Sequence, residues 1–463
     1  MKINHNIAAL VANDNLNKTT DKLNKSLEKL SSGYRINCAA DDAAGMAISQ
    51  KMHMQVRGLE RASRNAADGV SFIQTAEGAL NETENMVQRM RELSIQSANA
   101  TNTLDDRKAI QQEIDELKKE INRISTDTEF NGKKLLNGTC QSQAVSDNPG
   151  FKLLTLSDSV AKDTYTMTLT QAAEQASYTG TASSAGSFGS TEAGKVIING
   201  VSLEIESGDT WEEAFTKLQN QCDNIGIDLS CSGTPDVPGT LTFSSKQFGA
   251  SQILEIQVNN SNLATKMGIG TNIMDSGKDA KLALDSTSGF SPTASATADG
   301  KTVTITDRGG FKMVLTADGT VGTETNLTVL DAGYVPLQIG ANEGQTVDIN
   351  IPSVDCATLG IDLMNVCTEK GCQKAINSAD DAIAQVSAVR AKLGAYQNRL
   401  ESSINSLDTT ALNLTDSLSN IEDVDMSEEM ATYTQNNVLS QAGTAMLAQA
   451  NNKPQQILQL LQG

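Results

Sequence analysis

Proline is scarce in this chain of 463 residues, and its placement is uneven. There are seven prolines; none precedes Pro149, and Pro454 alone follows Pro352. A proline inside a helix costs about 3 kcal/mol, because it removes a backbone hydrogen bond and its ring clashes with the preceding turn. Long helices can therefore form in the two proline-free arms, before residue 149 and after residue 352.

Aromatic residues and positive charge are also scarce. Aromatics make up 3% of the residues, and the formal net charge is −20. Proteins that read nucleic acids need a basic surface and often use aromatic stacking platforms, whereas a chain of this charge is repelled by a phosphate backbone. We therefore expect no nucleic-acid partner.

Long apolar runs are missing as well. No stretch approaches the roughly 18 apolar residues that a membrane-spanning helix needs. The first residues, MKINHNIAALVAND, are interrupted by polar side chains and lack the apolar core of a signal peptide. We expect a soluble chain without membrane insertion, which would leave the cell only by a route that needs no cleaved signal.

The sequence also lacks the motifs of common catalytic and metal sites. It has two histidines, His5 and His53, and contains no HExxH, phosphate-binding GxxxxGK[ST] or GxSxG motif. The seven cysteines form no CxxC pair, so we expect buried or partly buried free thiols and not a zinc site or a disulfide framework. The prediction is a protein that is not an enzyme and has no cofactor and no metal.

What the two arms do contain is a heptad pattern of apolar residues. In the first arm, Leu59, Ala66, Ile73, Leu80 and Val87 recur every seven residues. In the second arm the steps alternate between four and three, which is typical of a coiled coil; the residues are Leu393, Leu400, Ile404, Leu407, Ala411, Leu414, Leu418 and Ile421. A further helix is predicted, with Asn102 or Thr103 as its N-terminal cap; its apolar residues are Ile110, Ile114, Leu117, Ile121 and Ile124.

The ends of the two arms carry opposite charge. Residues 1–64 contain ten Lys and Arg against six Asp and Glu, whereas 415–463 contain one lysine against six Asp and Glu. An apolar stripe on a single helix stays wet, and each leucine left in water forgoes about 1.5–3 kcal/mol. We therefore expect the arms to pair with each other; the alternative is that each packs separately on the middle of the chain.

The middle of the chain, residues 141–334, has a different pattern. It is rich in Gly, Ser and Thr, and its short alternating runs are separated by turn signals such as Asn199-Gly200 and Asp299-Gly300. The predicted fold is therefore mainly α, a long coiled-coil helical rod formed by both termini, with an inserted β-rich domain. The predicted divisions are terminal helices at 1–43 with 421–463, a rod with a β-hairpin at 44–140 with 335–420, and a variable insert at 141–334.

Several motifs in this order strongly resemble bacterial flagellin. In the first arm they are LSSGYRINCAADDAAGMAI at 30–48, VQRMRELSIQSAN at 87–99 and FNGKKLLNG at 130–138. In the second they are LQIGANEGQTVDINI at 337–351, VSAVRAKLGAYQNRLESSI at 386–404 and the tail PQQILQLLQG. Residues 195–270 are similar to a small repeat motif found in many flagellin inserts. The resemblance covers both arms, about half of the chain.

The resemblance implies a structural subunit that polymerises with copies of itself into an extracellular flagellar filament for swimming. It also implies secretion in an unfolded state through the flagellar type III export apparatus, with a chaperone and a cap protein as partners. Terminal segments of flagellins are disordered in the monomer, and an isolated helix with such sparse apolar stripes is marginal in water. We therefore expect a set of terminal residues to be buried only on assembly: Ile3, Ile7, Leu10, Leu27, Leu30, Ile457, Leu460 and Leu461.

The resemblance further implies recognition by an innate immune Toll-like receptor. The matching positions are Arg89 and Leu93, with Glu113 on the next helix. Relative to a seam through Leu80 and Val87, residues 89 and 93 are expected to share an outward face. The alternative interpretation is that this face packs against the next subunit in the filament.

Three other functions fit the sequence less well. A hook–filament junction protein would share the terminal helices and the export route, but the LSSGYRIN and QSAN runs favour a filament flagellin. A carbohydrate-binding or adhesive insert would want stacked aromatics, and Trp211 is the one tryptophan. An enzyme would need a catalytic cluster in the insert, and 141–334 contains no histidine. The seven cysteines depart from the family, whose members seldom carry any.

Overall fold

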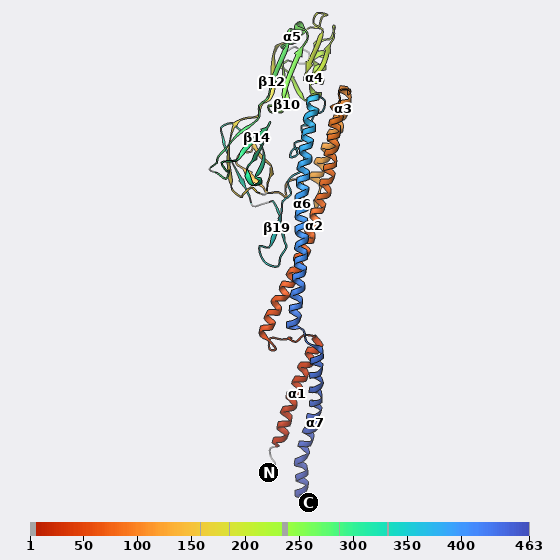
Figure 1. Ribbon diagram of the computed structural model, residues 1–463, viewed down its shortest axis with the longest axis vertical. Helices are drawn as coiled ribbons and strands as arrows, with labels where there is room; N and C mark the ends of the chain where they lie inside the picture. The colour runs from red at the N-terminus through yellow and green to blue at the C-terminus, as the bar shows by residue number, and fades with distance from the viewer. Residues whose placement is uncertain are drawn as a thin grey trace. The chain divides into compact units, whose positions relative to one another are not determined.

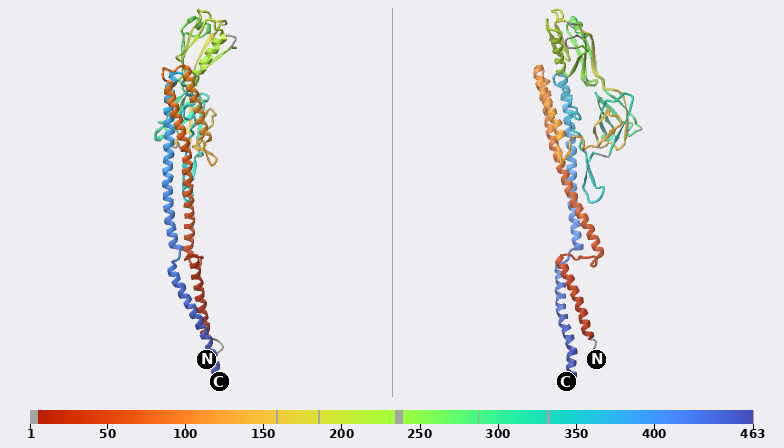
Figure 2. Two further views of the ribbon diagram at one scale, coloured as in Figure 1. Left: turned by 90° about the vertical axis from the view of Figure 1, so that its right-hand side faces the viewer. Right: turned by 180° about the vertical axis from the view of Figure 1, so that it is seen from behind.

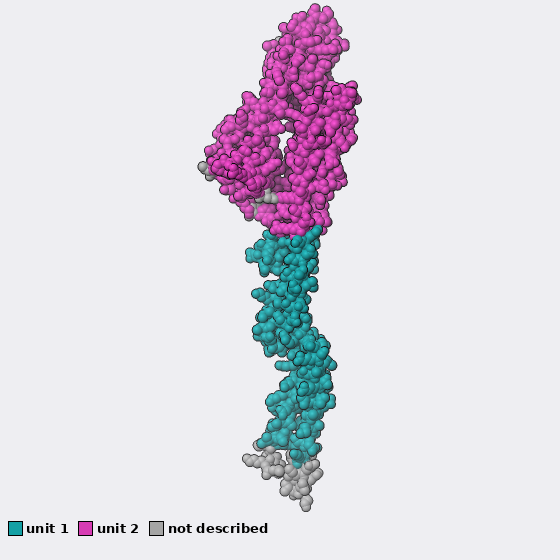
Figure 3. Space-filling model, in the orientation of Figure 1, with its two compact units in different colours: residues 1–68, 338–346, 400–463 teal, residues 69–337, 347–399 magenta. Residues whose placement is uncertain are grey.

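The computed structural model describes residues 6–157, 159–184, 186–233, 239–286, 288–330 and 333–462, with side chains as far as Lys453 and without that of Ala182. The chain divides into two compact units (Figure 3). Unit 1 comprises residues 1–68, 338–346 and 400–463, and unit 2 comprises 69–337 and 347–399.

Unit 1 is built from helices. Helix α1 (Ile7–Ser32) lies along α7 (Met426–Gln462), as Figures 1 and 2 show, and the unit also contains the first part of α2 (Ala43–Ser97) and the last part of α6 (Glu369–Glu422). Asn6 caps α1 by accepting a hydrogen bond from the Ala9 N–H, and Gly33 ends it at φ 77°, a conformation that glycine adopts without strain. The expected pairing of the two arms is confirmed, with α1 on α7.

Backbone hydrogen bonds tie the α1–α2 connection to the α6–α7 connection within unit 1. The Arg35 N–H donates to the Glu422 carbonyl at 2.6 Å, and the Val424 N–H donates to the Gly33 carbonyl at 3.0 Å. The His53 ring lies beside them, with Nε2 2.9 Å from Glu422 Oε2. Backbone groups in the two connections, where the helices are interrupted, therefore find hydrogen-bond partners in each other.

The helices of unit 2 bury the predicted seams. Residues 69–97 of α2 pack with α3 (Leu104–Asp127) and with residues 369–399 of α6. Ile73, Leu80, Val87 and Leu393 are fully buried, which confirms the heptad positions expected there. The predicted cap of α3 is confirmed as Thr103, whose hydroxyl accepts the Asp106 N–H in a capping box. Among the described helices, none is long and apolar enough to span a membrane.

The insert contains two separate hydrophobic cores. The residues of one, the nested core, lie in sequence between two segments that together form the other, the outer core. The outer core is enclosed by antiparallel sheets of order β13-β5-β17-β3 and β14-β15-β16-β4. Their strands are β3 (Ala144–Ser146), β4 (Phe151–Leu156), β5 (Thr164–Gln171), β13 (Lys281–Leu284), β14 (Ser295–Asp299), β15 (Thr302–Thr306), β16 (Lys312–Ala317) and β17 (Glu324–Val329).

The nested core lies between 175 and 276, which includes the predicted repeat motif at 195–270. Its sheets have the orders β6-β10-β9 and β12-β11-β7-β8, and Trp211, Phe215 and Phe243 fill its interior. The elements are β6 (Gln175–Ala182), β7 (Gly194–Ile198), β8 (Val201–Ile205), α4 (Trp211–Asn224), β9 (Ile227–Cys231), β10 (Thr240–Phe248), β11 (Ile253–Val258), α5 (Ser261–Met267) and β12 (Asn272–Ser276). The β-rich character predicted for the insert is confirmed, but its division into two cores was not predicted.

Two short hairpins complete the fold. β1 (Glu129–Phe130) and β2 (Lys133–Lys134) are joined by Asn131-Gly132, both at positive φ. β18 (Val335–Gln338) pairs with β19 (Thr346–Ile349), and Asn65 Nδ2 of α2 donates to the Gln338 carbonyl at 3.2 Å.

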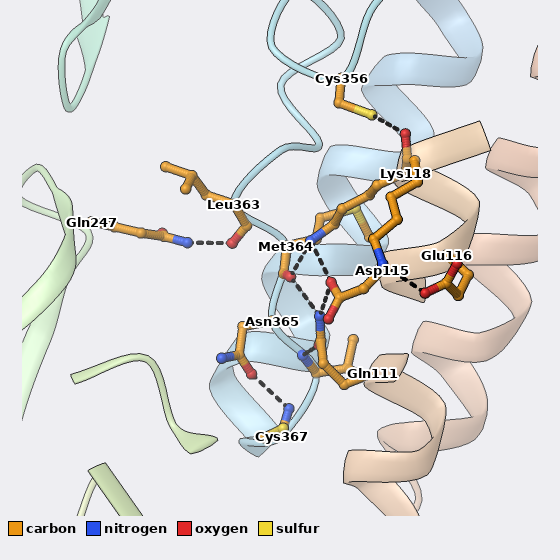
Figure 4. A network of polar contacts seen from close by, with 12 residues as sticks. Gln111, Asp115, Glu116, Lys118, Gln247, Cys356, Leu363, Met364, Asn365 and Cys367 are labelled. Atoms are coloured by element: carbon orange, nitrogen blue, oxygen red, sulfur yellow. Dashed lines mark hydrogen bonds and ion pairs between the residues drawn. The ribbon is translucent and has the colours of Figure 1, made fainter. Parts of the chain in front are cut away.

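Side chains of α3 hold the segment that leads from β19 to α6, as Figure 4 shows. Gln111 accepts the Val366 N–H at 2.8 Å and donates to the Met364 carbonyl at 3.1 Å, which satisfies two backbone groups with one amide. Lys118 Nζ donates to the same carbonyl at 2.9 Å. On the insert side, Gln247 donates to the Leu363 carbonyl. This segment is therefore fixed from α3 and from the nested core, all within unit 2.

Candidate assembly surface

Unit 1 leaves most of its large apolar side chains in water. Among the described residues, thirteen of the nineteen strongly exposed large apolar side chains belong to unit 1, which is less than a third of the chain. The distribution is the reverse of what burial alone favours, because an isolated protein gains by covering such side chains. We call them the exposed apolar set: Ile7, Leu10, Val11, Leu27, Tyr34, Ile48, Met54, Leu412, Met426, Met430, Val438, Leu439 and Met446.

Five members of the exposed apolar set lie on α7 and point to several sides of that helix: Met426, Met430, Val438, Leu439 and Met446. Successive residues of a helix are turned by about 100°, so the exposed positions from Met426 round to Leu439 cover about 220° of its circumference. Asn436 and Gly443, which face α1, lie within the remaining arc of about 140°. Large apolar side chains that point to several sides of a helix are normally covered by neighbours on those sides. Helix α1 covers one side of α7 only.

The α1–α7 contact itself is thin. Ser26 is buried and donates to the Glu429 carboxylate, which also lies 4.0 Å from Lys29 Nζ. At the far end Asn6 Nδ2 donates to the Ala450 carbonyl at 2.9 Å. The leucines that face α7, such as Leu16 and Leu23, are only half-buried. Opposite charge in the two arms thus yields one long ion pair among the described residues of this contact, and such pairs contribute little.

The predicted assembly residues divide into three groups. Ile7, Leu10 and Leu27 are outward and exposed, Ile7 to 70%, so their apolar area is free for other partners. Leu30 is half-buried. Ile3 and the side chains of Ile457, Leu460 and Leu461 lie outside the described residues. Their burial on assembly stays a prediction.

The apolar residues of the α6–α7 junction and of the start of α2, such as Met426 and Met54, were not predicted, because they do not fall on a heptad seam.

The three predicted receptor residues do not form one outward patch. Arg89 and Glu113 are exposed and paired, with Arg89 Nη2 2.9 Å from Glu113 Oε1. The hydrogen bonds that Arg89 donates to Glu113, and then to Glu92, raise the pKa of Arg89. The expectation that Leu93 points outward is wrong: its side chain is 1% exposed. The reason is that α2 packs against both α3 and α6 here, so its buried arc is wider than a single seam and also takes in Met90.

The thiols of this protein are mostly buried, and the described residues form no metal-binding group. All seven cysteines are free thiols, and Cys38 is the exposed one while Cys231 is half-buried. The expectation of buried or partly buried cysteines holds for six of the seven and is wrong for Cys38, which is exposed. Among the described residues, no group of three or more His, Cys, Asp or Glu is placed to hold a metal ion.

Comparison with known proteins gives this surface its context. Residues 3–141 match the bacterial flagellin N-terminal helical region, and residues 376–461 match the C-terminal helical region. The chain is 36% identical to a flagellin of Clostridium tyrobutyricum, in an alignment that covers 98% of this chain and 100% of the relative. The chain belongs to the bacterial flagellin family. A flagellin of Bacillus subtilis is 35% identical over the full length of both chains, and a B-type flagellin of Pseudomonas aeruginosa is 35% identical over 100% of this chain and 99% of its own.

Family membership makes this flagellin a structural subunit of the extracellular flagellar filament. It favours that role over the hook–filament junction protein that was the alternative. The match spans the two arms that carry the exposed apolar set, and the insert lies between the two matched regions.

Proposed function

We propose that this flagellin polymerises with copies of itself through unit 1, and that the resulting filament serves swimming motility. The observation that carries the proposal is the exposed apolar set of unit 1, five of whose members point outward from α7 on sides that α1 leaves open. Apolar area on several sides of one helix needs several neighbours to cover it, and in a homopolymer those neighbours are copies of the same chain. Burial of this area is the driving force for assembly.

The thin α1–α7 contact supports disorder of segments 1–43 and 421–463 in the free subunit. A pair of helices with half-buried leucines and one long ion pair gains little against the entropy of ordering. We propose that these segments order on assembly, when Ile3, Ile457, Leu460 and Leu461 are buried with Ile7, Leu10 and Leu27. Chain ends that fold last suit secretion through the flagellar type III export apparatus, with a chaperone covering the apolar ends and a cap protein guiding insertion.

Seeded polymerisation tests the proposal directly. Purified protein is concentrated with a precipitating salt and with sheared filament seeds, and the product is examined by electron microscopy and sedimentation. Long hollow filaments are the expected result. Persistent monomer, with seeds that extend a control flagellin, would point to a junction protein or to a need for other partners.

Two matched variants test whether unit 1 carries the contact. Val438 in α7 is 59% exposed, and Val321 in the insert is 51% exposed. A charge at 438 must be desolvated if that position is covered, so Val438→Asp should raise the critical concentration at least about tenfold, equivalent to about 1.4 kcal/mol. Val321→Asp should leave it unchanged. An equal effect of the two substitutions would refute the assignment to unit 1.

We also propose that a free subunit is recognised by an innate immune Toll-like receptor through Arg89 and Glu113. Support comes from the resemblance and from the exposure of this ion pair on adjoining helices. Leu93 is buried, so in this conformation it supports the helices beneath the pair and offers no contact area. An Arg89→Ala variant that kept full receptor signalling would rule out the contact.

A further inference from the structure

The buried methionines and most of the strongly exposed methionines of this protein belong to different units, while Met46, Met52 and Met86 are half-buried. Five described methionines are buried, and all five belong to unit 2: Met90, Met167, Met267, Met313 and Met364. Four of the five strongly exposed methionines belong to unit 1: Met54, Met426, Met430 and Met446. The fifth, Met274, lies on strand β12 of the insert. Exposure of the sulfur decides which of them a dissolved oxidant reaches.

The four exposed methionines of unit 1 all belong to the exposed apolar set. Met426 and Met430 are four residues apart at the start of α7 and share a face. Met446 lies about 160° round the helix from Met430, and Met54 projects from α2. The sulfur atoms thus stand on more than one side of unit 1, where neighbouring copies are proposed to pack.

We infer that these four methionines make assembly sensitive to two-electron oxidants, so that a peroxide inactivates the free subunit whereas a completed filament is protected. The inference rests on the proposed function, because it requires unit 1 to be the contact between copies. In the reaction the thioether sulfur attacks one peroxide oxygen, the O–O bond breaks, and the sulfur is oxidised to a sulfoxide while the peroxide is reduced to water. No carbon–sulfur bond breaks, and no cofactor takes part.

A sulfoxide changes the physics of the contact. Methionine adapts to irregular apolar neighbours, whereas its sulfoxide is polar and is an added hydrogen-bond acceptor. In water the sulfoxide is hydrated, so the free subunit tolerates it. Against a neighbouring copy it must lose that water, and an apolar surface offers no replacement. The effect therefore falls on incorporation and not on the fold of unit 2, whose methionines are buried.

Met274 supplies an internal reference. It is 71% exposed, and Met446 is 65% exposed on α7 and no less open where segment 421–463 is disordered, so a dissolved oxidant reaches both sulfurs in the free subunit. Met274 belongs to the insert, outside the exposed apolar set. Its oxidation should proceed at the same rate in free and assembled protein, whereas oxidation of Met54, Met426, Met430 and Met446 should slow on assembly.

The test uses the full chain with Cys38→Ser, because Cys38 is the one fully exposed thiol and also reacts with peroxide. Free subunits and seeded filaments are treated with hydrogen peroxide, and each methionine is followed by peptide mass spectrometry. The expected result is protection of the four sulfurs by at least about tenfold in filaments, with Met274 unprotected. Equal rates at the four sites in both states would overturn the inference.

A substitution series separates sulfoxide from general damage. The variant M54L/M426L/M430L/M446L keeps apolar volume without an oxidisable sulfur, so it should polymerise after peroxide treatment. Met274→Leu, the control, should stay as sensitive as the Cys38→Ser parent, and methionine sulfoxide reductase should restore assembly of the oxidised parent. A fourfold variant that remained peroxide-sensitive, or an oxidised parent with an unchanged critical concentration, would refute the inference alone. Failure of the untreated parent to polymerise on competent seeds would instead refute the proposed function, and the inference with it.

Discussion

Gly58 of α2 lies so close to Ala341 of the β18–β19 hairpin that a Cβ added to the glycine would be 2.9 Å from the Ala341 Cβ. Real Cβ atoms essentially never approach so closely, so one of the two backbones would have to move. Nearby, Asn65 Nδ2 donates to the Gln338 carbonyl at 3.2 Å, which holds the hairpin on the helix. The hairpin is thus seated on α2 at a position where a larger residue would force a shift.

This contact reverses the usual effect of replacing a helical glycine. Gly78 lies in the same helix with nothing within 4 Å of its added Cβ, so Gly78→Ala should stabilise by up to about 1 kcal/mol through helix propensity. Gly58→Ala should instead lose that gain to displacement of the hairpin. Thermal unfolding compares the two variants, and hydrogen exchange around 338–346 reports the displacement. Equal stabilisation by both would show that the hairpin does not sit on Gly58.

Burial of Leu93 predicts that its truncation acts through stability. Removing a fully buried leucine side chain leaves a cavity and typically costs about 2–5 kcal/mol, so Leu93→Ala should lower the free energy of unfolding of unit 2 by that amount. Leu27→Ala, at a position exposed to solvent, should change it by less than about 0.5 kcal/mol. Chemical denaturation measures both. A neutral Leu93→Ala would mean that the side chain is outward after all.

Gln111 should be needed to hold the segment between β19 and α6. Gln111→Met keeps the side-chain length but leaves the Val366 N–H and one bond of the Met364 carbonyl unsatisfied, at a cost of about 1–3 kcal/mol. The neighbouring Gln112 is exposed, so Gln112→Met is a matched control that should be silent. Faster hydrogen exchange at the Val366 amide is the expected signature. Unchanged exchange in Gln111→Met would show that the Lys118 bond to Met364 suffices.

The buried thiols predict loss of stability in alkali. Burial raises the pKa of Cys222 from 9.0 to about 12, so the folded state binds the thiol proton more tightly than the unfolded state does. This contribution is complete below pH 9 and is lost as the pH rises from 9 towards 12, by at most about 1.4 kcal/mol per pH unit. Chemical denaturation from pH 8 to 10.5 should show a flatter slope for Cys222→Ala than for wild type. Cys38→Ala, at the exposed thiol, is the control and should keep the wild-type slope.

Local patterns predicted much of the helical fold. The sevenfold spacing of Ile73, Leu80 and Val87 corresponds to a buried seam, and the Thr103–Asp106 capping box begins α3 as expected. The predictions of the seam and of the cap are correct because a helical cap and a helical face depend on residues within a few turns of each other. The division of the insert into two cores was not predicted, since it depends on pairings such as β13 with β5, far apart in the chain. The three-part domain division stays a prediction.

The sequence by itself determined that the two arms are helices with apolar stripes and that a β-rich segment separates them, because periodicity and turn signals are local properties. It favoured pairing of the arms, which the contact of α1 with α7 then confirmed. Only the tertiary structure decided which apolar residues are covered. Leu93 is buried by two neighbouring helices, whereas Val438 on α7 remains in water with one neighbour. Periodicity says which residues share a face, but the number of neighbours decides how much of a helix is buried, and in unit 1 one chain supplies too few.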